Sequence, residues 1–356
     1  MKKKIILFIP SIEGGGVEKN FNLIIKYLLN KVDKIYILSA DRTKKKFSKK
    51  IIYICPRSRY WSNKGRLSKT LICTYLLIKN FLFKEVIILS FQSNVIAIII
   101  SKLFRFKVLI RLNTSLEKYI KNSFKKILFK FLYSIADGII VNSVRFQKEL
   151  NNLKLKSNLI YNLLDSKKTI NELPFFKNYK KLKILNIGRL TEQKDQLTLI
   201  RGLDILNKKR IDFRCCIIGR GKYKNLLQKE IFNYKLNKKI KLIGYKKNAE
   251  SYIFKSDLFV LTSAFEGLPN VLIEAQKYNI PIISSDCPTG PREILLNGKL
   301  GDLFPVGNFK LLSSKIIAFH DNKKILKKKS LKAKRYLNRF NPIINSKKYF
   351  KLLSRL

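Results

Sequence analysis

Two glutamates are spaced so that both could face one ligand. Glu266 and Glu274 lie in the segment SAFEGLPNVLIEA, directly after the apolar run Leu258–Leu261. Pro269 suits the first turn of a helix. We therefore expect Glu266 on a loop and Glu274 on the helix, about 7–8 Å further along its axis. The N–H groups after Gly267 attract an anion. The segment predicts an anion site flanked by two carboxylates, which are natural partners for the hydroxyls of a ribose or a hexose.

Two cations precede this segment in the chain. Arg189 and Lys194 lie five positions apart on a loop that begins with Gly188, after the apolar run Ile184–Ile187. Arginine binds phosphate oxygens through its planar fork and lysine binds them as a point charge, so the pair could clamp a diphosphate. Both could instead be ordinary solvated charges in a very basic chain. Together with the two carboxylates they favour a ligand with hydroxyls at both ends and a diphosphate between, as in a nucleoside-diphosphate sugar.

A third glycine-rich loop lies near the N-terminus. Gly14–Gly16 separates the run Ile5–Ile9 from an amphipathic helix expected over Val17–Leu29. Glycines there let the backbone approach a phosphate, with Gly15 and Gly16 nearest the helix. No Gly-Lys-Ser/Thr follows, so the loop is not a P-loop, and a plain tight turn is the alternative.

Gly219 and Gly221 follow the run Phe213–Ile218 and resemble the beginning of a dinucleotide-binding fingerprint. Lys224 stands where the third glycine belongs, and no acidic residue follows at the required spacing. The loop is therefore weak evidence for NAD, but it suits a backbone that lies against a nucleotide base.

The composition limits the class of protein. Lys and Arg number 75 and Asp and Glu 23, a formal net charge of +52, and 46% of the residues are hydrophobic. The hydrophobic content excludes wholesale disorder. The charge favours polyanionic partners, although compositional drift in a Lys-, Ile- and Asn-rich chain could account for much of it. The single histidine, His320, leaves no room for a multi-histidine metal site.

Cysteine usage and hydropathy favour a cytoplasmic protein. The five cysteines form no CxxC pair, and an odd number without a framework fits a reducing cytosol. The N-terminal apolar stretch Ile5–Ile9 is too short for an export signal, and no run reaches the roughly 18 apolar residues of a membrane span.

Parallel strands must position the candidate site residues. Continuous apolar runs alternate with stretches of helix length, which is typical of strands buried on both faces of a doubly wound sheet. The expected strands are Ile5–Ile9, Ile35–Leu38, Val86–Leu89, Val108–Ile110, Ile139–Val141, Ile184–Ile187, Phe213–Ile218, Ile240–Ile243, Leu258–Leu261 and Ile280–Ile283.

The length of 356 residues suggests two domains at about 150 residues each. The series of apolar runs breaks once, after Tyr161. This break predicts an N-terminal domain over residues 1–165, a linker over 166–181, a C-terminal domain over 182–335 and a helical tail over 336–356. Ligands of such sheets bind at the carboxyl ends of the strands, so we expect the active site between the two domains.

These segments together resemble the retaining glycosyltransferases of family 4, which have the GT-B fold. SAFEGLPNVLIEA is similar to their motif of two glutamates separated by seven residues. GGGVEK resembles their N-terminal glycine loop, and NIGRLTEQKDQLTLI their diphosphate-binding loop. IIGRGKYKNLL and IKLIGY follow in the family's order. IPIISSDCPTGPREILLNGKLGDLFPVGN resembles bacterial members that build surface polysaccharides, such as lipopolysaccharide, and lipid-linked oligosaccharides. The first domain matches more loosely, through the glycine loop and YSIADGIIVNS.

The resemblance implies an α/β protein with two facing Rossmann-like domains and a C-terminal helix that crosses back to the first. It implies that Arg189 and Lys194 bind the diphosphate of a UDP- or GDP-sugar. Glu266 would contact the donor sugar and Glu274 the ribose. Glu266, Arg189 and Lys194 are the expected catalytic residues. The wider donor site would add Gly15, Gly16, Gly188, Gly219, Gly244, Tyr245, Gly267, Leu268, Asn270 and Val271.

One position departs from the resemblance. Many relatives place a histidine of the first domain near the sugar, and the corresponding stretch here is Arg111-Leu112-Asn113-Thr114. Either Arg111 or Asn113 takes that contact to the sugar or acceptor, or the contact is missing.

The expected mechanism needs no metal or other cofactor. Retention by double displacement requires a carboxylate nucleophile about 5–5.5 Å from an acid partner, and Glu266 and Glu274 are expected to lie further apart. The resemblance implies front-face attack, in which the leaving phosphate accepts the proton of the acceptor. Arg189, Lys194 and the helix N-terminus then stabilise the departing diphosphate.

The segment Leu116–Tyr133 combines apolar residues spaced three and four apart with four lysines off that stripe, namely Lys118, Lys121, Lys125 and Lys130. This pattern is typical of interfacial membrane attachment, and a core helix with a solvated face is the alternative. With the lipid-linked acceptors that the resemblance implies, it favours a peripheral enzyme on the cytoplasmic face of the inner membrane. Such an enzyme would bind anionic lipid and act on a polyprenyl-diphosphate-linked glycan.

Two other classes of protein stay open. A nucleic-acid-binding protein would use the +52 charge, but no RNP motif occurs and the basic residues are spread along the chain, so no specific nucleic acid is expected. A nucleotide-sugar epimerase or dehydrogenase would need the NAD fingerprint that is incomplete at Lys224.

Overall fold

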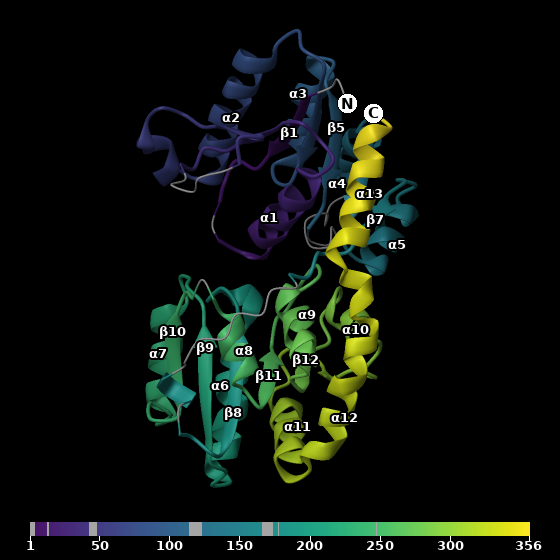
Figure 1. Cartoon of the computed structure of the whole chain (residues 1–356). Helices are drawn as coiled ribbons and strands as arrows, with labels where there is room; N and C mark the ends of the chain where they lie inside the picture. The colour runs from purple at the N-terminus through teal and green to yellow at the C-terminus, as the bar shows by residue number, and fades with distance from the viewer. Residues whose placement is uncertain are drawn as a thin grey trace. The chain divides into compact units, whose positions relative to one another are not determined.

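The computed structural model of the chain describes residues 4–12, 14–42, 48–113, 123–165, 174–176, 178–246 and 248–356. Contacts divide the chain into two compact units (Figure 1). Unit 1 comprises Met1–Asp165 together with Phe340–Leu356, and unit 2 comprises Ser166–Arg339. The C-terminal segment therefore belongs to the same unit as the N-terminus. Most of the predicted linker, residues 166–173 and 177, lies outside the described residues.

Unit 1 is built on a seven-stranded sheet in the order β3-β2-β1-β4-β5-β6-β7, with parallel pairing. The five residues of β4 are all buried, because helices cover both faces of the sheet. The strands are β1 (Lys4–Phe8), β2 (Ile35–Leu38), β3 (Ile51–Ile54), β4 (Val86–Ser90), β5 (Lys107–Arg111), β6 (Gly138–Val141) and β7 (Asn158–Leu159).

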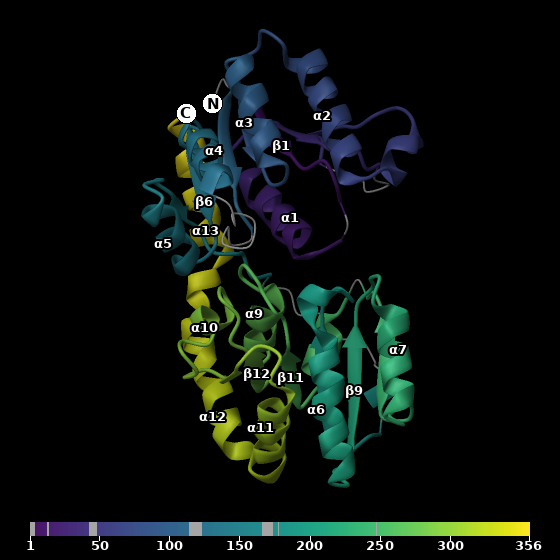
Figure 2. The same ribbon diagram turned by 180° about the vertical axis from the view of Figure 1, so that it is seen from behind.

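Two helical layers cover this sheet. One contains α1 (Gly16–Leu28) and α13 (Pro342–Ser354), which contact each other and share one buried cluster. The other contributes to a second buried cluster on the opposite face. Figure 2 brings α3 and α4 of this layer to the front and leaves α13 behind. Its helices are α2 (Arg66–Phe81), α3 (Asn94–Leu103), α4 (Ser123–Ser134) and α5 (Val144–Asn152), and the short helix η1 (Arg59–Asn63) precedes α2.

Unit 2 repeats this plan with a six-stranded sheet in the order β10-β9-β8-β11-β12-β13, again with parallel pairing. The strands are β8 (Leu182–Ile187), β9 (Phe213–Ile218), β10 (Ile240–Gly244), β11 (Leu258–Leu261), β12 (Ile282–Ser285) and β13 (Asp302–Phe304). The helices are α6 (Gln196–Lys208), α7 (Lys224–Asn233), α8 (Glu250–Phe254), α9 (Asn270–Lys277), α10 (Pro291–Ile294), α11 (Phe309–Asp321) and α12 (Lys323–Ala333). The short helices are η2 (Pro174–Phe176), η3 (Glu192–Lys194) and η4 (Lys334–Phe340), the last residue of which belongs to unit 1.

The predicted fold class is confirmed, and each of the ten predicted apolar runs overlaps a strand. Three strands were not predicted, β3, β7 and β13, and all three lie at the edge of a sheet. An edge strand has a neighbour on one side only, and no residue of β3 is buried: three are intermediate and Ile52 is 36% exposed. The run predicted from Ile280 begins as β12 at Ile282, after Pro281, which has no N–H to donate.

A buried arginine fixes the last helix to unit 1. Arg111, at the end of β5, is 1% exposed, and its Nε donates to the hydroxyl oxygen of Tyr349 on α13 at 2.7 Å. Its other nitrogens donate to Asn162 Oδ1 at 2.5 Å and to Asn113 Oδ1. Burial raises the pKa of Tyr349, and the positive charge of Arg111 opposes that rise. The guanidinium therefore has oxygen partners on three nitrogens, as a buried charge requires.

We expect Tyr349→Phe to loosen α13 selectively, because it leaves Arg111 Nε without this partner inside the unit. A lost hydrogen bond to a charged group costs about 1.5–3 kcal/mol. Hydrogen exchange followed by mass spectrometry should show faster exchange in α13 than in wild type. Tyr60→Phe is the control, because Tyr60 is 58% exposed. Equal protection of α13 in Tyr349→Phe and wild type would contradict the role of this contact.

Candidate active site

Glu266 is a buried carboxylate held by partners from three loops of unit 2. It is 6% exposed, and its Oε1 accepts a hydrogen bond from Ser263 Oγ at 2.6 Å and one from Lys194 Nζ. The backbone oxygen of Glu266 accepts a hydrogen bond from the hydroxyl of Thr289. A buried charge is stable only with a cation and hydrogen bonds around it, and Lys194 supplies the cation. The loop therefore presents Glu266 in one fixed orientation.

The loop after β8 is joined to the loop after β11 through Gln193. The backbone oxygen of Gln193 accepts a hydrogen bond from Ala264 N at 2.9 Å, and its side-chain Nε2 donates to the oxygen of Phe265 at 3.0 Å. Its Oε1 accepts a bond from Arg189 at 3.0 Å. The two predicted cations and Glu266 thus lie on loops that hold one another, although 72 positions separate Lys194 from Glu266.

The loop after β9 packs directly on the loop after β8. Gly188 N donates to the oxygen of Ile218 at 3.0 Å. A Cβ added to Gly219 would lie 1.8 Å from the backbone oxygen of Gly188, so no larger residue fits there. Glycine at position 219 therefore allows the loops after β8 and β9 to pack closely.

Gly290 sets the position of the Glu266 loop from the other side. It follows β12, has a φ of +88°, and a Cβ there would lie 2.3 Å from the backbone oxygen of Gly267. Both the left-handed backbone and the lack of space require glycine. Together with Thr289, this residue supports the segment that carries Glu266.

Glu274 lies on α9 as the sequence predicted, and Glu266 lies on the preceding loop. Glu274 is 7% exposed. The helix begins at Asn270 with Pro269 at the N-cap, so the proline stands one position before the first turn. Gly267 and Leu268 thus connect Glu266 to Pro269, and Asn270 and Val271 are the first two residues of α9.

Arg220 and Tyr245 lie together beyond the ends of β9 and β10. The guanidinium carbon of Arg220 is 5.3 Å from the centre of the Tyr245 ring, and the tyrosine is 49% exposed. Gly244, with a φ of +77°, turns the chain before it. The exposed ring and planar cation form a surface on which a flat base could stack.

The residues predicted from the first domain all lie in unit 1. Gly15 and Gly16 begin α1, but Gly15 N donates to Glu18 Oε2 at 2.7 Å, a capping contact that the sequence analysis did not foresee. Asn113 donates to the oxygen of Phe91 at 3.0 Å and accepts from Arg111. A sugar or acceptor contact by Arg111 or Asn113 stays a prediction, while the structure gives both side chains protein partners.

Sequence reasoning missed the residues that support the carboxylate, mainly Ser263, Gln193 and the segment Cys287–Gly290. The sequence feature that could have indicated these residues is the segment CPTGP, which follows β12 at the carboxyl end of that strand.

Cys287 is 1% exposed, and burial together with the charge of Glu266 raises the pKa of its thiol to about 12.

Two of the four predicted membrane lysines, Lys118 and Lys121, lie outside the described residues. Lys125 and Lys130 are exposed on α4. Among the residues that the structure describes, no helix combines the length and the apolar character needed to cross a bilayer.

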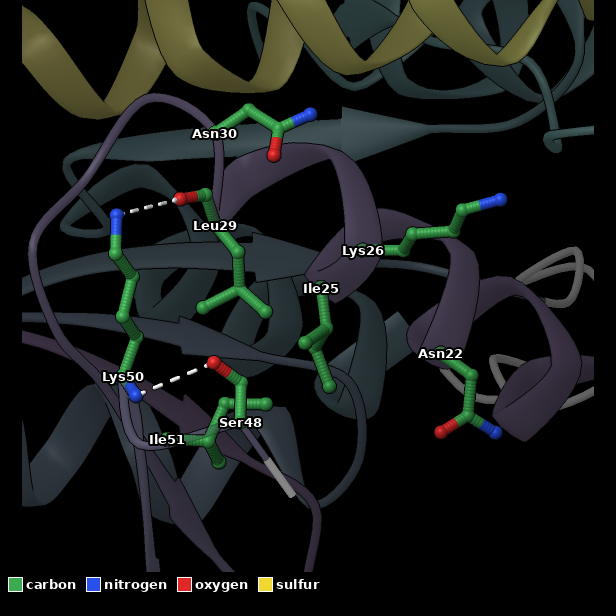
Figure 3. A pocket seen from close by; sticks show the side chains of 8 residues that line it. All are labelled: Asn22, Ile25, Lys26, Leu29, Asn30, Ser48, Lys50 and Ile51. Carbon is green, nitrogen blue, oxygen red and sulfur yellow. Dashed lines mark hydrogen bonds between the residues drawn. The ribbon is translucent and has the colours of Figure 1, made fainter.

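Within the same described ranges, no three or more His, Cys, Asp or Glu side chains come together in a metal-binding arrangement. A pocket of about 460 Å³ in unit 1 lies between the end of α1 and the start of β3 (Figure 3). Lys50 Nζ donates there to the oxygen of Leu29 at 3.5 Å. This pocket contains none of the predicted site residues.

The two parallel-sheet units have the GT-B fold, which solved glycosyltransferases share. Residues 168–336 match the family model of the glycosyl transferases group 1. This match spans nearly all of unit 2, the unit that contains Glu266 and Lys194. The comparisons do not support the nucleic-acid-binding or NAD-dependent alternatives.

Two relatives and one solved structure illustrate this similarity. An uncharacterised glycosyltransferase of Methanocaldococcus jannaschii is 37% identical over 197 residues, which is 51% of this chain and about half, 48%, of that protein. The N-acetylgalactosamine-N,N'-diacetylbacillosaminyl-diphospho-undecaprenol 4-alpha-N-acetylgalactosaminyltransferase of Campylobacter jejuni is 26% identical over 96% of both chains. Anabaena HepE, solved in complex with UDP and glucose, shares the fold with a TM-score of 0.81 at 17% identity, covering 99% of this chain and 100% of HepE. Other relatives are named for the biosynthesis of amylovoran and colanic acid.

We expect Gly290→Ala to disturb the Glu266 loop, whereas Gly298→Ala should not. Both glycines have a φ of +88°, so alanine strains the backbone equally, by about 1–3 kcal/mol. Only Gly290 adds a collision, since the nearest atom to a Cβ at Gly298 is at 3.7 Å. Hydrogen exchange followed by mass spectrometry should show faster exchange of residues 263–269 in Gly290→Ala than in Gly298→Ala. Equal exchange of this segment in the two variants would refute the supporting role of Gly290.

Proposed function

We propose that the whole chain transfers a sugar from a nucleoside-diphosphate sugar to a polyprenyl-diphosphate-linked glycan, with retention of the anomeric configuration. The donor nucleotide is UDP or GDP. Structures with this fold have been solved with UDP and UDP-glucose, which favours UDP. The Campylobacter relative, named for a diphospho-undecaprenol substrate, supports the acceptor class. The reaction would serve the assembly of a cell-surface polysaccharide or a glycoprotein glycan.

The observation that carries this proposal is the buried Glu266 beside Lys194. Lys194 and Arg189 supply positive charge for a diphosphate on one loop, and Glu266 supplies an acceptor for sugar hydroxyls on the adjoining loop. Glu274 on α9 would bind the ribose, and the loops of Gly188, Gly219 and Gly267 would approach the nucleotide closely.

The proposed chemistry is front-face attack by the acceptor hydroxyl. The bond between the anomeric carbon and the diphosphate oxygen breaks, and the leaving diphosphate accepts the proton of the acceptor. Lys194 and Arg189 stabilise the charge that grows on the diphosphate, and the site positions both reactants. Because these cations provide the positive charge, the proposed reaction needs no metal ion.

The proposed location is the cytoplasmic face of the inner membrane, where a polyprenyl-linked acceptor and a soluble donor meet. The enzyme would be peripheral and bind anionic lipid. The support for this location is the predicted acceptor class and the exposed lysines of α4.

We expect Glu266→Gln to lower turnover by at least about tenfold while UDP still binds, because the amide is neutral and contacts the sugar differently. Glu192→Gln is the matched control, since Glu192 is an exposed carboxylate on the loop that carries Lys194. Single-turnover kinetics with the true donor and calorimetry with UDP separate the two effects. Wild-type turnover in Glu266→Gln would show that the sugar assignment is wrong.

The second expected result concerns Arg189, which is exposed and therefore cleaner to test than Lys194, which is half-buried and paired with Glu266. Arg189→Gln should weaken UDP binding by about 1–3 kcal/mol, and Arg189→Glu should weaken it further, because the new charge repels the diphosphate. Arg201→Gln, an exposed position on α6, should bind UDP as wild type does. Equal affinities for Arg189→Gln and Arg189→Glu would count against a diphosphate contact.

A further inference from the structure

Three neighbouring helices of unit 1 leave rows of apolar side chains on their outer faces. α2 contacts α3, and α3 contacts α4, within the layer that covers one face of the sheet. Their inner residues, such as Cys73, Leu77 and Ile98, are at most 1% exposed in the buried cluster. The outer rows make up what we name the outer apolar face: Leu67, Leu71, Tyr75, Val95, Ile99, Leu103, Ile127, Leu128 and Phe131.

The spacing of the rows on α2 and α3 shows that each row lies along one side of its helix. On α2 the exposed residues are Leu67, Leu71 and Tyr75, at intervals of four, with exposed fractions of 67%, 57% and 56%. On α3 they are Val95, Ile99 and Leu103, again at intervals of four. Residues four apart lie on one side of a helix.

The sequence of α3 makes this exposure unusual. NVIAIIISKL is apolar around most of its circumference, a pattern typical of a helix that is covered on all sides. Unit 1 covers only its inner side, since Ala97 and Ile98 are at most 2% exposed while Leu103 is 69% exposed. Exposed apolar rows on neighbouring helices are typical of a binding face.

The charges around the outer apolar face are all of one sign within these helices, because α2, α3 and α4 contain no acidic residue. Lys79 lies 5.8 Å from the ring centre of Tyr75. Lys102 binds Asp137 at 3.0 Å and is thereby partly neutralised. The further exposed lysines are Lys64, Lys125, Lys126 and Lys130.

We propose that the outer apolar face of α2, α3 and α4 docks unit 1 on an anionic lipid bilayer. Apolar side chains that enter the headgroup region, with lysines beside them, combine the two forces that hold a protein at such a surface. A second copy of this chain is disfavoured as occupant, because a symmetric pair would bring the same lysines together. The inference deepens the proposed function, on which it rests for the nature of the acceptor, and extends the membrane contact from α4 to three helices.

Flotation with vesicles tests this face without donor or acceptor. The vesicles contain phosphatidylcholine, with or without phosphatidylglycerol, at about 0.1 M and about 0.5 M salt. The wild type should float with the anionic vesicles, less at high salt. Leu71→Asn with Ile99→Asn should reduce the partition coefficient about tenfold or more, because two apolar side chains no longer leave water.

The matched control is Ile343→Asn with Ile344→Asn on α13, on the opposite face of the same sheet. These residues are 53% and 43% exposed, close to the 57% and 46% of Leu71 and Ile99. The control should float as wild type does. A second pair of variants tests the charge. Lys79→Gln with Lys130→Gln should lower both the binding to anionic vesicles and the salt dependence of that binding. The control, Lys347→Gln with Lys348→Gln on α13, should lower the binding and its salt dependence by a smaller amount.

Three results would overturn the proposal. In the first, the wild type fails to float with anionic vesicles. In the second, the outer-face variant and the α13 variant float equally well. In the third, the wild type is a dimer and the Leu71→Asn, Ile99→Asn variant is a monomer. Circular dichroism of each variant verifies its fold, and UDP calorimetry verifies unit 2. If the wild type floats with anionic vesicles but does not bind UDP, the proposed function is wrong while the docking proposal still holds.

Discussion

The contact between Lys194 and Glu266 ties together the loops that form the candidate site. Each partner needs the other, since a carboxylate that is 6% exposed is unstable without a cation. Ser263 and Gln193 add the hydrogen bonds that fix the two loops around the pair. Gly219 and Gly290 let the loops after β9 and β12 approach the loops that carry this pair, and a Cβ at Gly188 would lie 3.2 Å from the Lys194 side chain. The contact between Lys194 and Glu266 also implies that changing Lys194 alone alters the protein's stability as well as its chemistry.

Much of unit 2 could be predicted from the sequence, because its buried strands are continuous apolar runs and its loops carry distinctive residues. The placement of Glu266 on a loop and Glu274 on a helix followed from Pro269 and the length of the segment. The partners of Glu266 could not be predicted in the same way. Ser263 is an ordinary serine in the sequence, and only the turn after β11 brings its hydroxyl to 2.6 Å from the carboxylate.

Unit 1 was harder to predict for two physical reasons. Its edge strand β3 is partly exposed and does not form a buried apolar run. Side chains such as Arg111 could serve either a ligand or the protein, and spacing along the chain does not distinguish these uses. The structure gives Arg111 the hydroxyl of Tyr349, a residue 238 positions away, as a partner. The same limitation applies to α2 and α3, whose apolar residues look like core in the sequence, although only their inner rows are buried.

The return of α13 to unit 1 has a consequence for the order in which the protein folds during synthesis. Unit 1 contains residues from both ends of the chain, and all of unit 2 lies between them. A ribosome therefore completes Ser166–Arg339 before it makes Tyr349, and Arg111 lacks this partner until then. The core formed by α1 and α13 closes last, after unit 2 has had time to fold as an independent domain. Until α13 is made, part of the apolar surface of α1 stays uncovered, so nascent unit 1 depends on protection from aggregation during this time.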